Sequence, residues 1–428
     1  MFFNKNIIRQ VAGIIFMAAM VACNKELPEP KPIEPDPPAD AETILQKLDA
    51  SEFSILKAAV TKASTFTSPT GKVSDILGNA TATMTFFAPD NAALLRSFAL
   101  LGLPASEASL NFFTAGKLDT LLKYHLIGGE AITSGRINPA APALNLYLQS
   151  MLVLSAPSAN LPPGYRMPIF MGKQGNSVFA NNIPVTAPDM AAANGVMHKV
   201  YVALLPPDKV LWQTIFANAD GGYNYFKAAV IRADGGINPE GQFQAALSAP
   251  NANFTALIPT NAAFEQLLIA RIAGALIIQG EQPAVANLAA QGLVAAHGST
   301  IISDPASIQT YGPQLAAFMT RELAQAIVAY HLLAKPAATP VGYRNYTVNF
   351  PAGNAALVPT LVNASVANHP GVALQATFGP AGVTAATAKG LGNETASNII
   401  LSAPPSSTND VNHVNGVIHR IDQVLLPQ

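Results

Sequence analysis

The feature of this chain that most constrains its fold is an internal repeat. The segment 56–60 recurs 170 positions later as 226–230, and the segment 85–94 recurs at the same offset as 255–264. Two matches in one register indicate that the chain builds one structural unit twice. A fold for this chain must therefore place two related units in tandem.

Two further pairs of motifs extend the repeat. Tyr-His-Leu at 124–126 matches 330–332, Asn-Gly-Val-Met-His at 194–198 matches Asn-Gly-Val-Ile-His at 415–419, and both units close with Leu-Leu-Pro. The growing offset predicts an insertion near 265–320 and a longer region from 331 to 410 in the second unit. Because paired prolines end a strand, the boundary is expected at Pro206-Pro207, which gives domains 41–207 and 208–428.

The repeated motifs fall on helices and on strands. Apolar residues at helical spacing predict amphipathic helices at 53–60 and 118–125, the second ending in Tyr-His. Short strands are expected at 85–87 and 255–258. The asparagines that follow, Asn91 and Asn261 with Asp90 or Thr260 beside them, are expected to cap the next helix. Alternation after each Asn-Gly turn predicts a strand with its histidine turned inward.

The order of these motifs resembles the fasciclin-like domain, twice over. The likeness covers nearly everything after residue 40 and is most specific in Asn-Gly-Val-Ile-His-Arg-Ile-Asp at 415–422. It implies an α+β fold in which each domain is a wedge of two packed β-sheets with flanking helices. It also implies an extracellular or envelope adhesion module with no known enzymatic activity.

The N-terminus has the layout of an export signal. Lys5 and Arg9 precede an apolar run over 11–22 that is shorter than the about 20 residues needed to span a bilayer. The run ends at Cys23 and resembles a bacterial lipoprotein box, so 1–22 is the predicted signal peptide and Cys23 the lipid attachment site. An ordinary secretory signal with a chance cysteine is the alternative. The proline-rich segment 23–40 is a predicted tether, and lipid is the expected sole anchor.

Composition excludes several functions. The chain carries 24 Lys+Arg against 25 Asp+Glu, and its sequence shows no run of Lys and Arg that could bind phosphates, so we expect no nucleic-acid partner. A single cysteine rules out an intrachain disulfide. We find neither the residue spacing of a zinc helix nor a nucleotide or nucleophile motif, and we expect no metal, no cofactor and no enzymatic activity. The repeat-related histidines His125, His198, His331 and His419 are predicted to be structural.

An acidic residue followed by an apolar one stands five positions before each terminal asparagine. These candidate partner-binding residues are Asp189 and Met190 in the first unit and Asp410 and Val411 in the second. Fasciclin-like domains of animal matrix proteins present a similar pair as an adhesion motif. The alternative is that each aspartate only caps the turn before the strand.

Two functions remain open from the sequence. The first is a lipid-anchored adhesion or interaction protein of the cell envelope, expected at the surface or periplasmic face of an outer membrane, that binds an envelope protein or glycan. The second is a glycan-capturing accessory lipoprotein of a nutrient-uptake system. Such a protein needs exposed aromatic side chains, for which Tyr165, Tyr343 and Tyr346 are the candidates, whereas Trp212 is expected in the core.

Overall fold

The structure is a computed structural model of the chain. It describes residues 42–137, 145–154, 164–236, 241–308, 315, 320–334, 344–379, 382–402 and 408–428. The predicted signal peptide, the lipid site Cys23 and the tether up to residue 40 lie outside the described residues, as does Tyr343.

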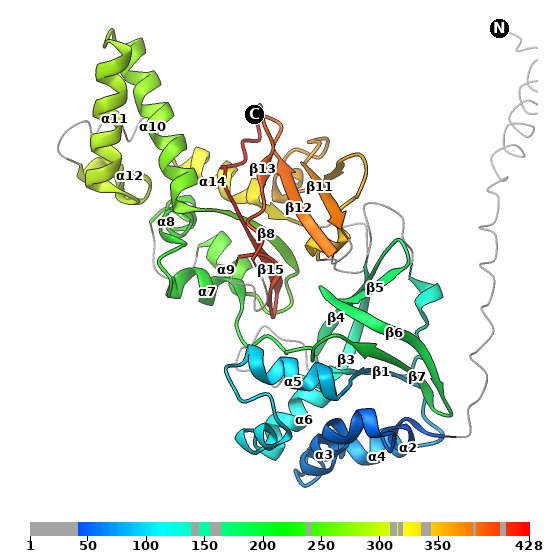
Figure 1. Ribbon diagram of the computed structural model, residues 1–428. Helices are drawn as coiled ribbons and strands as arrows, with labels where there is room; N and C mark the ends of the chain where they lie inside the picture. Colours follow the sequence, from blue (N-terminus) through cyan, green and yellow to red (C-terminus); the bar gives the residue numbers. More distant parts are fainter. Residues whose placement is uncertain are drawn as a thin grey trace, which may run out of the picture. The chain divides into compact units, whose positions relative to one another are not determined.

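The N-terminal repeat is a mixture of helices and strands (Figure 1). Its helices are α2 (Ile44–Lys47), α3 (Ser54–Ala63), α4 (Val73–Gly78), α5 (Asn91–Leu100) and α6 (Ala115–Tyr124). Its strands are β1 (Met84–Pro89), β2 (Leu126–Gly128), β3 (Leu146–Val153), β4 (Arg166–Gln174), β5 (Ser177–Ala180), β6 (Ile183–Ala192) and β7 (Gly195–Val200).

The seven strands of this repeat form two sheets that share strands. β1 lies between antiparallel β2 and parallel β7, while β4 lies between β3 and β5. β3 also pairs with β2, and β6 pairs with both β5 and β7. The strands therefore close into a barrel in the order β1 to β7. Each strand of this repeat that the structure describes is thereby paired on both sides.

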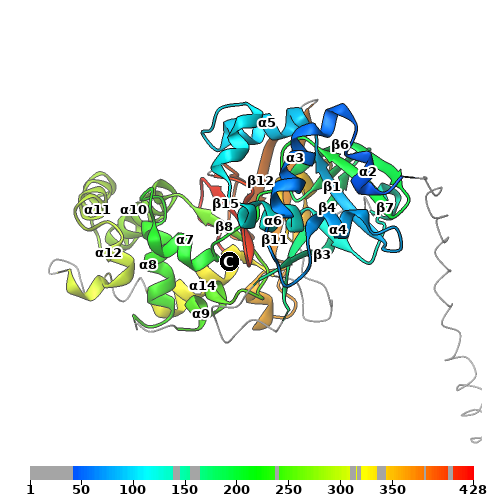
Figure 2. The same cartoon turned by 90° about the horizontal axis from the view of Figure 1, so that it is seen from below.

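The helices of the N-terminal repeat cover the β1 and β7 side of the strands (Figures 1 and 2). Their apolar stripes meet Phe86, Ala88 and Met197 in one buried cluster. A second cluster on the other side of β1 contains Phe87, Ile169 and Val200. Side chains alternate across a strand, so neighbouring residues of β1 supply both clusters.

The C-terminal repeat follows the same plan with additions. Its helices are α7 (Leu211–Ala217), α8 (Asn224–Ala233), α9 (Gln242–Ser248), α10 (Asn261–Ile278), α11 (Pro283–His297), α12 (Thr300–Ser303) and α14 (Arg321–His331). Its strands are β8 (Phe254–Pro259), β9 (Leu332–Leu333), β10 (Ala356–Val358), β11 (Val372–Gly379), β12 (Gly382–Lys389), β13 (Ser397–Asn398), β14 (Val411–His413) and β15 (Gly416–Ile421).

The two repeats share their central pairing. β8 pairs parallel with β15 in the register Phe254 to Gly416, as β1 pairs with β7 in the register Met84 to Gly195. The strands of the C-terminal repeat form two four-stranded sheets, β14-β15-β8-β9 and β10-β11-β12-β13. The chain is therefore an α+β protein made of two tandem units built on one plan.

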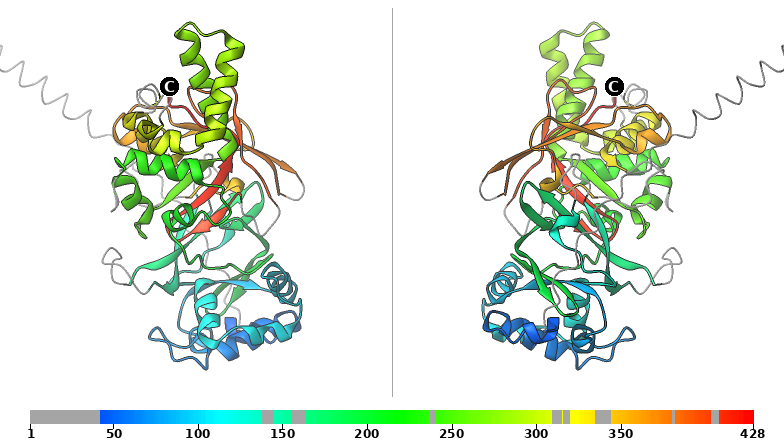
Figure 3. Two further views of the ribbon diagram at one scale, coloured as in Figure 1. Left: turned by 90° about the vertical axis from the view of Figure 1, so that its left-hand side faces the viewer. Right: turned by 90° about the vertical axis from the view of Figure 1, so that its right-hand side faces the viewer.

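The extra helices of the C-terminal repeat form a hairpin. α10 has 18 residues where α5 has 10, and α11 packs back along it (Figures 1 and 3). In the part of the chain that the structure describes, α10 is the one helix long and apolar enough to cross a membrane. Its Phe264, Leu268 and Ile272 nevertheless belong to the protein core.

Candidate functional site

Asp189 and His198 form a corner between β6 and β7 in the N-terminal repeat. The Asp189 backbone N–H donates to His198 Nδ1 (3.1 Å), and His198 Nε2 donates to the carbonyl oxygen of Ile132 (2.8 Å). The strand pairing shifts register between Ala187 and Met190, and Asp189 takes φ 61° there. Aspartate is one of the few side chains that tolerate this left-handed conformation.

The Asp189 carboxylate completes the corner. It accepts hydrogen bonds from the backbone N–H of Ser134 (2.8 Å) and from the Ser134 hydroxyl. The side chain is 36% exposed, so solvent still reaches it. Met190 is half-buried and packs against the helical core of this repeat.

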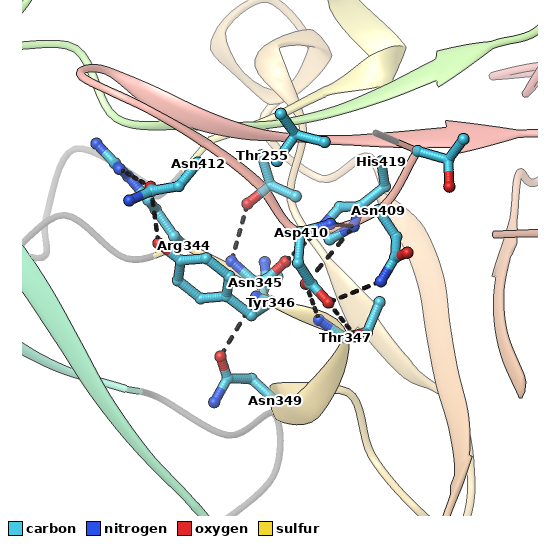
Figure 4. A network of polar contacts seen from close by, with 12 residues as sticks. Thr255, Arg344, Asn345, Tyr346, Thr347, Asn349, Asn409, Asp410, Asn412 and His419 are labelled. Carbon is cyan, nitrogen blue, oxygen red and sulfur yellow. Dashed lines mark hydrogen bonds and ion pairs between the residues drawn. The ribbon is translucent and has the colours of Figure 1, made fainter. Parts of the chain in front are cut away.

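The C-terminal repeat builds an equivalent corner from Asp410 and His419 (Figure 4). The Asp410 N–H donates to His419 Nδ1 (3.2 Å), and Nε2 donates to the Asn345 carbonyl (2.7 Å). Asp410 has φ 54°. Its carboxylate accepts from the N–H of Thr347 (2.7 Å) and from the Thr347 hydroxyl (2.6 Å).

The two corners differ in exposure. The Asp410 carboxylate also accepts from Asn409 Nδ2 (2.9 Å) and is only 4% exposed, against 36% for Asp189. Val411 is half-buried against the helical core of its repeat. The structure thus gives both aspartates the turn-holding role, and it leaves solvent access to the carboxylate in the N-terminal repeat.

A second repeated pair of histidines ties each helix end to the C-terminal segment of its repeat. His125 Nδ1 donates to Leu121 O (2.8 Å) and Nε2 accepts from Leu204 N (2.8 Å). His331 makes the same two bonds, to Ile327 O (2.7 Å) and from Leu425 N (2.9 Å). Both rings are fully buried, so each nitrogen needs such a partner.

Burial keeps these imidazoles neutral. It lowers the pKa of His125 and of His331 to about 4, and it also lowers the pKa of His198 and His419. His413 Nε2 lies 2.8 Å from the hydroxyl of Thr214, and burial lowers its pKa to about 4. Among the described residues no group of three His, Cys, Asp or Glu side chains is placed to hold a metal ion.

The terminal asparagines have a structural role that the sequence did not reveal. Asn194 Oδ1 accepts from the N–H of Ile44 at the start of α2, and Nδ2 donates to the carbonyls of Leu77 and Asn79 at the end of α4. Asn415 repeats this pattern with α7 and α9. One buried amide per repeat therefore links a turn to two helix ends.

Arg344 is a second feature that the sequence did not single out. It is 1% exposed and donates to the side chain of Asn253, to that of Asn412 and to two backbone carbonyls, all within the C-terminal repeat. Its guanidinium lies 4.9 Å from the ring centroid of Phe170 in the N-terminal repeat. Phe170 also joins Phe179 in a cluster with Tyr346, Val348 and Val417 of the C-terminal repeat.

Two expectations need correction. The caps of α5 and α10 are Asp90 and Thr260, whose side chains accept from the N–H groups of Ala93 and Ala263. Asn91 Oδ1 instead accepts from Ile55 N–H in the neighbouring helix α3, and Asn261 Nδ2 donates to the carbonyl oxygen of Gly221. The reason is geometric, because the residue before the first helical turn is the one that reaches its free amides.

The aromatic candidates for a glycan platform are largely inside the protein. Tyr346 is fully buried and donates its hydroxyl to Asn412 Oδ1 (2.9 Å), so it cannot stack on a sugar. Tyr165 is half-buried, and burial raises the pKa of its hydroxyl to about 12. Trp212 is 8% exposed in the α7 core, as expected.

Comparison with known proteins finds a family match in the N-terminal unit. Residues 51–206 match the family model described as the fasciclin domain. The aurofusarin biosynthesis cluster protein S of Gibberella zeae is 29% identical over 147 residues, which is 31% of this chain and 35% of that protein. The chain therefore spans about a third of the length of this curated relative.

A solved structure of a FAS1 domain pair from the insect cell adhesion molecule fasciclin I is also similar. The match covers 90% of this chain and 97% of that chain, with 14% identity and a TM-score of 0.29. The duplicated corners, asparagines and histidines described above come from this chain's own contacts and do not depend on that likeness.

Proposed function

We propose that the protein is a lipid-anchored interaction protein of the cell envelope that binds a protein or glycan partner through the corner around Asp189 and Met190. The fasciclin-domain match of residues 51–206 supports an adhesion-type module. The lipid on Cys23 is part of the proposal and rests on the sequence layout of the first 40 residues.

The observation that carries the proposal is the difference between two equivalent corners. Both aspartates hold a turn, yet Asp189 is 36% exposed and Asp410 is 4% exposed. A partner can contact only a carboxylate that solvent also reaches, and of the two aspartates Asp189 meets that condition better. Asp410 and Val411 are accordingly assigned to the fold of the C-terminal repeat.

The test compares Asp189→Asn with Asp410→Asn. Asparagine tolerates positive φ, and its amide keeps an acceptor for Ser134 N–H while Nδ2 faces a hydroxyl that can also accept. Asp189→Asn should therefore keep the melting temperature and weaken attachment of cells that carry the protein. Asp410→Asn sets Nδ2 against the donor of Asn409 and should lower the melting temperature while attachment persists. Normal attachment by folded Asp189→Asn would remove this corner from the proposal.

The anchor is tested separately. Cys23→Ser removes the sulfur that would take the lipid, so the protein should move from the membrane fraction to the soluble fraction. Retention of the variant in membranes would contradict the lipid anchor without affecting the corner.

A further inference from the structure

The hairpin of α10 and α11 presents an uncharged outer face. α11, from Pro283 to His297, contains no Asp, Glu, Lys or Arg, and its buried side packs on α10 through Ala286, Ala290 and Leu293. The opposite side is exposed. A surface helix normally turns charged residues to water, so the composition of this face needs a reason.

Four exposed residues of α11 form a seam at coiled-coil spacing. Val285, Leu288, Gly292 and Ala295 stand at i, i+3, i+7 and i+10. Val285 is 54% exposed and Leu288 is 72% exposed, which makes them two of the large apolar side chains that this structure leaves in water. Residues at this spacing lie along one stripe of a helix and pack against a second helix.

The seam is complementary to itself when two helices run antiparallel. With position 290 at the two-fold axis, Val285 lies opposite Ala295 of the other molecule, and Leu288 lies opposite its Gly292. Each large side chain thus meets a small one, and the symmetry repeats both pairs. A parallel pair would instead set Leu288 against Leu288 and glycine against glycine, leaving a gap at one end.

Charge favours the same arrangement. An uncharged face meets its own copy without like-charge repulsion, and antiparallel helices place each positive helix end beside a negative one. Glu281, exposed just before α11, falls in that register beside the last turn of the other α11, which carries His297. By the two-fold symmetry, each end of the contact places the acidic Glu281 of one molecule near the last turn of the other α11, which carries His297.

A lipid surface fits the hairpin less well. Residues 261–297 carry Glu265, Arg271 and Glu281 as their charged residues, so anionic headgroups gain no attraction. The segment contains no Trp or Tyr, and its one phenylalanine, Phe264, is buried in the core. Helices that lie in a membrane interface usually carry basic and aromatic anchors.

We infer that α11 is a self-association surface through which two molecules of this protein pair antiparallel. The contact of one 15-residue helix is smaller than the about 800 Å² per partner of a standard interface, so it is weak in solution. Molecules concentrated on one surface would overcome that weakness. The inference does not depend on the proposed partner corner.

Sedimentation of the full chain with Cys23→Ser tests the association. The protein should dimerise at high concentration, and Leu288→Glu should lower the association constant at least about tenfold, because two carboxylates enter the seam. Leu357→Glu, at a 58% exposed leucine of β10, is the matched control and should leave association unchanged. A monomer at about 1 mM, or equal losses in both variants, would overturn the inference.

Cross-linking tests the register. Cys23→Ser proteins carrying Val285→Cys or Ala295→Cys are mixed with a short bismaleimide. Mixed dimers should dominate, because like positions lie about 15 Å apart along an antiparallel pair. Predominant Val285→Cys homodimers would overturn the antiparallel pairing. Binding to phosphatidylcholine–phosphatidylglycerol vesicles that Leu288→Glu abolishes, with no dimer in solution, would assign the face to lipid instead.

Discussion

At the scale of single residues, the tightest constraint in the N-terminal repeat is at Gly195, where the turn enters β7. It has φ 142°, and a Cβ there would lie 1.8 Å from the carbonyl oxygen of Met84 across the parallel pair. The equivalent Gly416 would place a Cβ 2.6 Å from Phe254 O. A side chain at either position must separate the two central strands of its repeat.

Gly195→Ala should therefore cost at least about 4 kcal/mol of unfolding free energy, measured by urea denaturation. Gly175→Ala is the matched control. Gly175 also has positive φ, at 56°, but a Cβ there meets nothing within 4 Å, so the cost should be about 1–2 kcal/mol. Similar losses in both variants would show that backbone strain alone limits this turn and that the strand approach does not.

The sequence predicted the burial of the repeated histidines but missed side chains whose hydrogen-bond partners are distant in the sequence. The Tyr-His and Asn-Gly motifs predicted buried histidines at 125, 198, 331 and 419, because they stand in phase with apolar neighbours, and the structure confirms their burial. Arg344 has hydrogen-bond partners 69, 70 and 91 positions away, and a pattern of neighbouring residues cannot predict such contacts. The candidate Asp189 was found, but only the structure separates its exposure from that of Asp410.

At the scale of helices and strands, the buried asparagine of each repeat connects elements that are far apart in sequence. Asn194 Nδ2 donates to the two carbonyls at the end of α4, while its Oδ1 receives the N–H that begins α2. Helix ends carry unpaired backbone groups that need such partners when they are buried. The helices are thereby fixed to the turn before β7 rather than only packed on the sheet.

Asn194→Ala should lower the unfolding free energy by about 3 kcal/mol or more, because it leaves buried donors and acceptors unpaired. Asn91→Ala is the comparison. Asn91 is half-buried, and its bonds to Ile55 N, Ser51 O and Ser54 Oγ are partly or fully open to solvent, so its loss should cost about 1 kcal/mol. Thermal or urea unfolding measures both, and a smaller loss for Asn194→Ala than for Asn91→Ala would contradict the linking role.

Strand β6 shows why some strands were not predicted from the sequence. β6 alternates between half-buried and exposed residues from Ile183 to Pro188 and loses this alternation at Asp189, where its pairing with β7 shifts register. Strict alternation is expected only when one face stays buried along the whole strand. The hairpin of α10 and α11 lies largely in the insertion that the sequence predicted near 265–320, whereas its exposed seam appears only once the buried side is known.

At the scale of the whole molecule, buried neutral histidines predict acid sensitivity. The folded pKa of His125, His331 and His413 is about 4, below the ordinary value of 6.5 expected in the unfolded chain, and that of His198 and His419 is also lowered. The unfolded chain therefore binds more protons between these values. Stability is fully present above about pH 6.5 and is lost as the pH falls toward 4.

Each such histidine should contribute a slope of up to about 1.4 kcal/mol per pH unit in that window. Urea unfolding at several pH values between 7 and 4 measures the slope. His413→Gln removes one titrating ring, so it should reduce the slope by up to about 1.4 kcal/mol per pH unit. Glutamine can also hydrogen-bond to the hydroxyl of Thr214, the partner of His413. A flat free energy of unfolding from pH 7 to 5 would contradict the prediction.

Each repeat is also expected to fold by itself. The largest helical cores belong to one repeat each, and the contacts between repeats are concentrated around Phe170, Arg344 and Tyr346. The separate fragments 41–207 and 208–428 should each unfold cooperatively, at lower temperatures than in the joined chain because these contacts are lost. Failure of both to fold would indicate that one core is shared.

The contact between repeats can be weakened from one side at Gly172 of β4. A Cβ at this glycine would lie 2.3 Å from Asn349 Nδ2 in the C-terminal repeat and 3.8 Å from Asn145 Cβ. Its φ is not in the left-handed region, so a β-branched residue suits the strand itself. Gly172→Val should therefore split the unfolding of the joined chain into two transitions near those of the separate repeats. The same substitution in 41–207, where Asn349 is missing, should change the melting temperature little. If Gly172→Val destabilises 41–207 as much as the joined chain, the glycine serves the strand and the repeats are held together elsewhere.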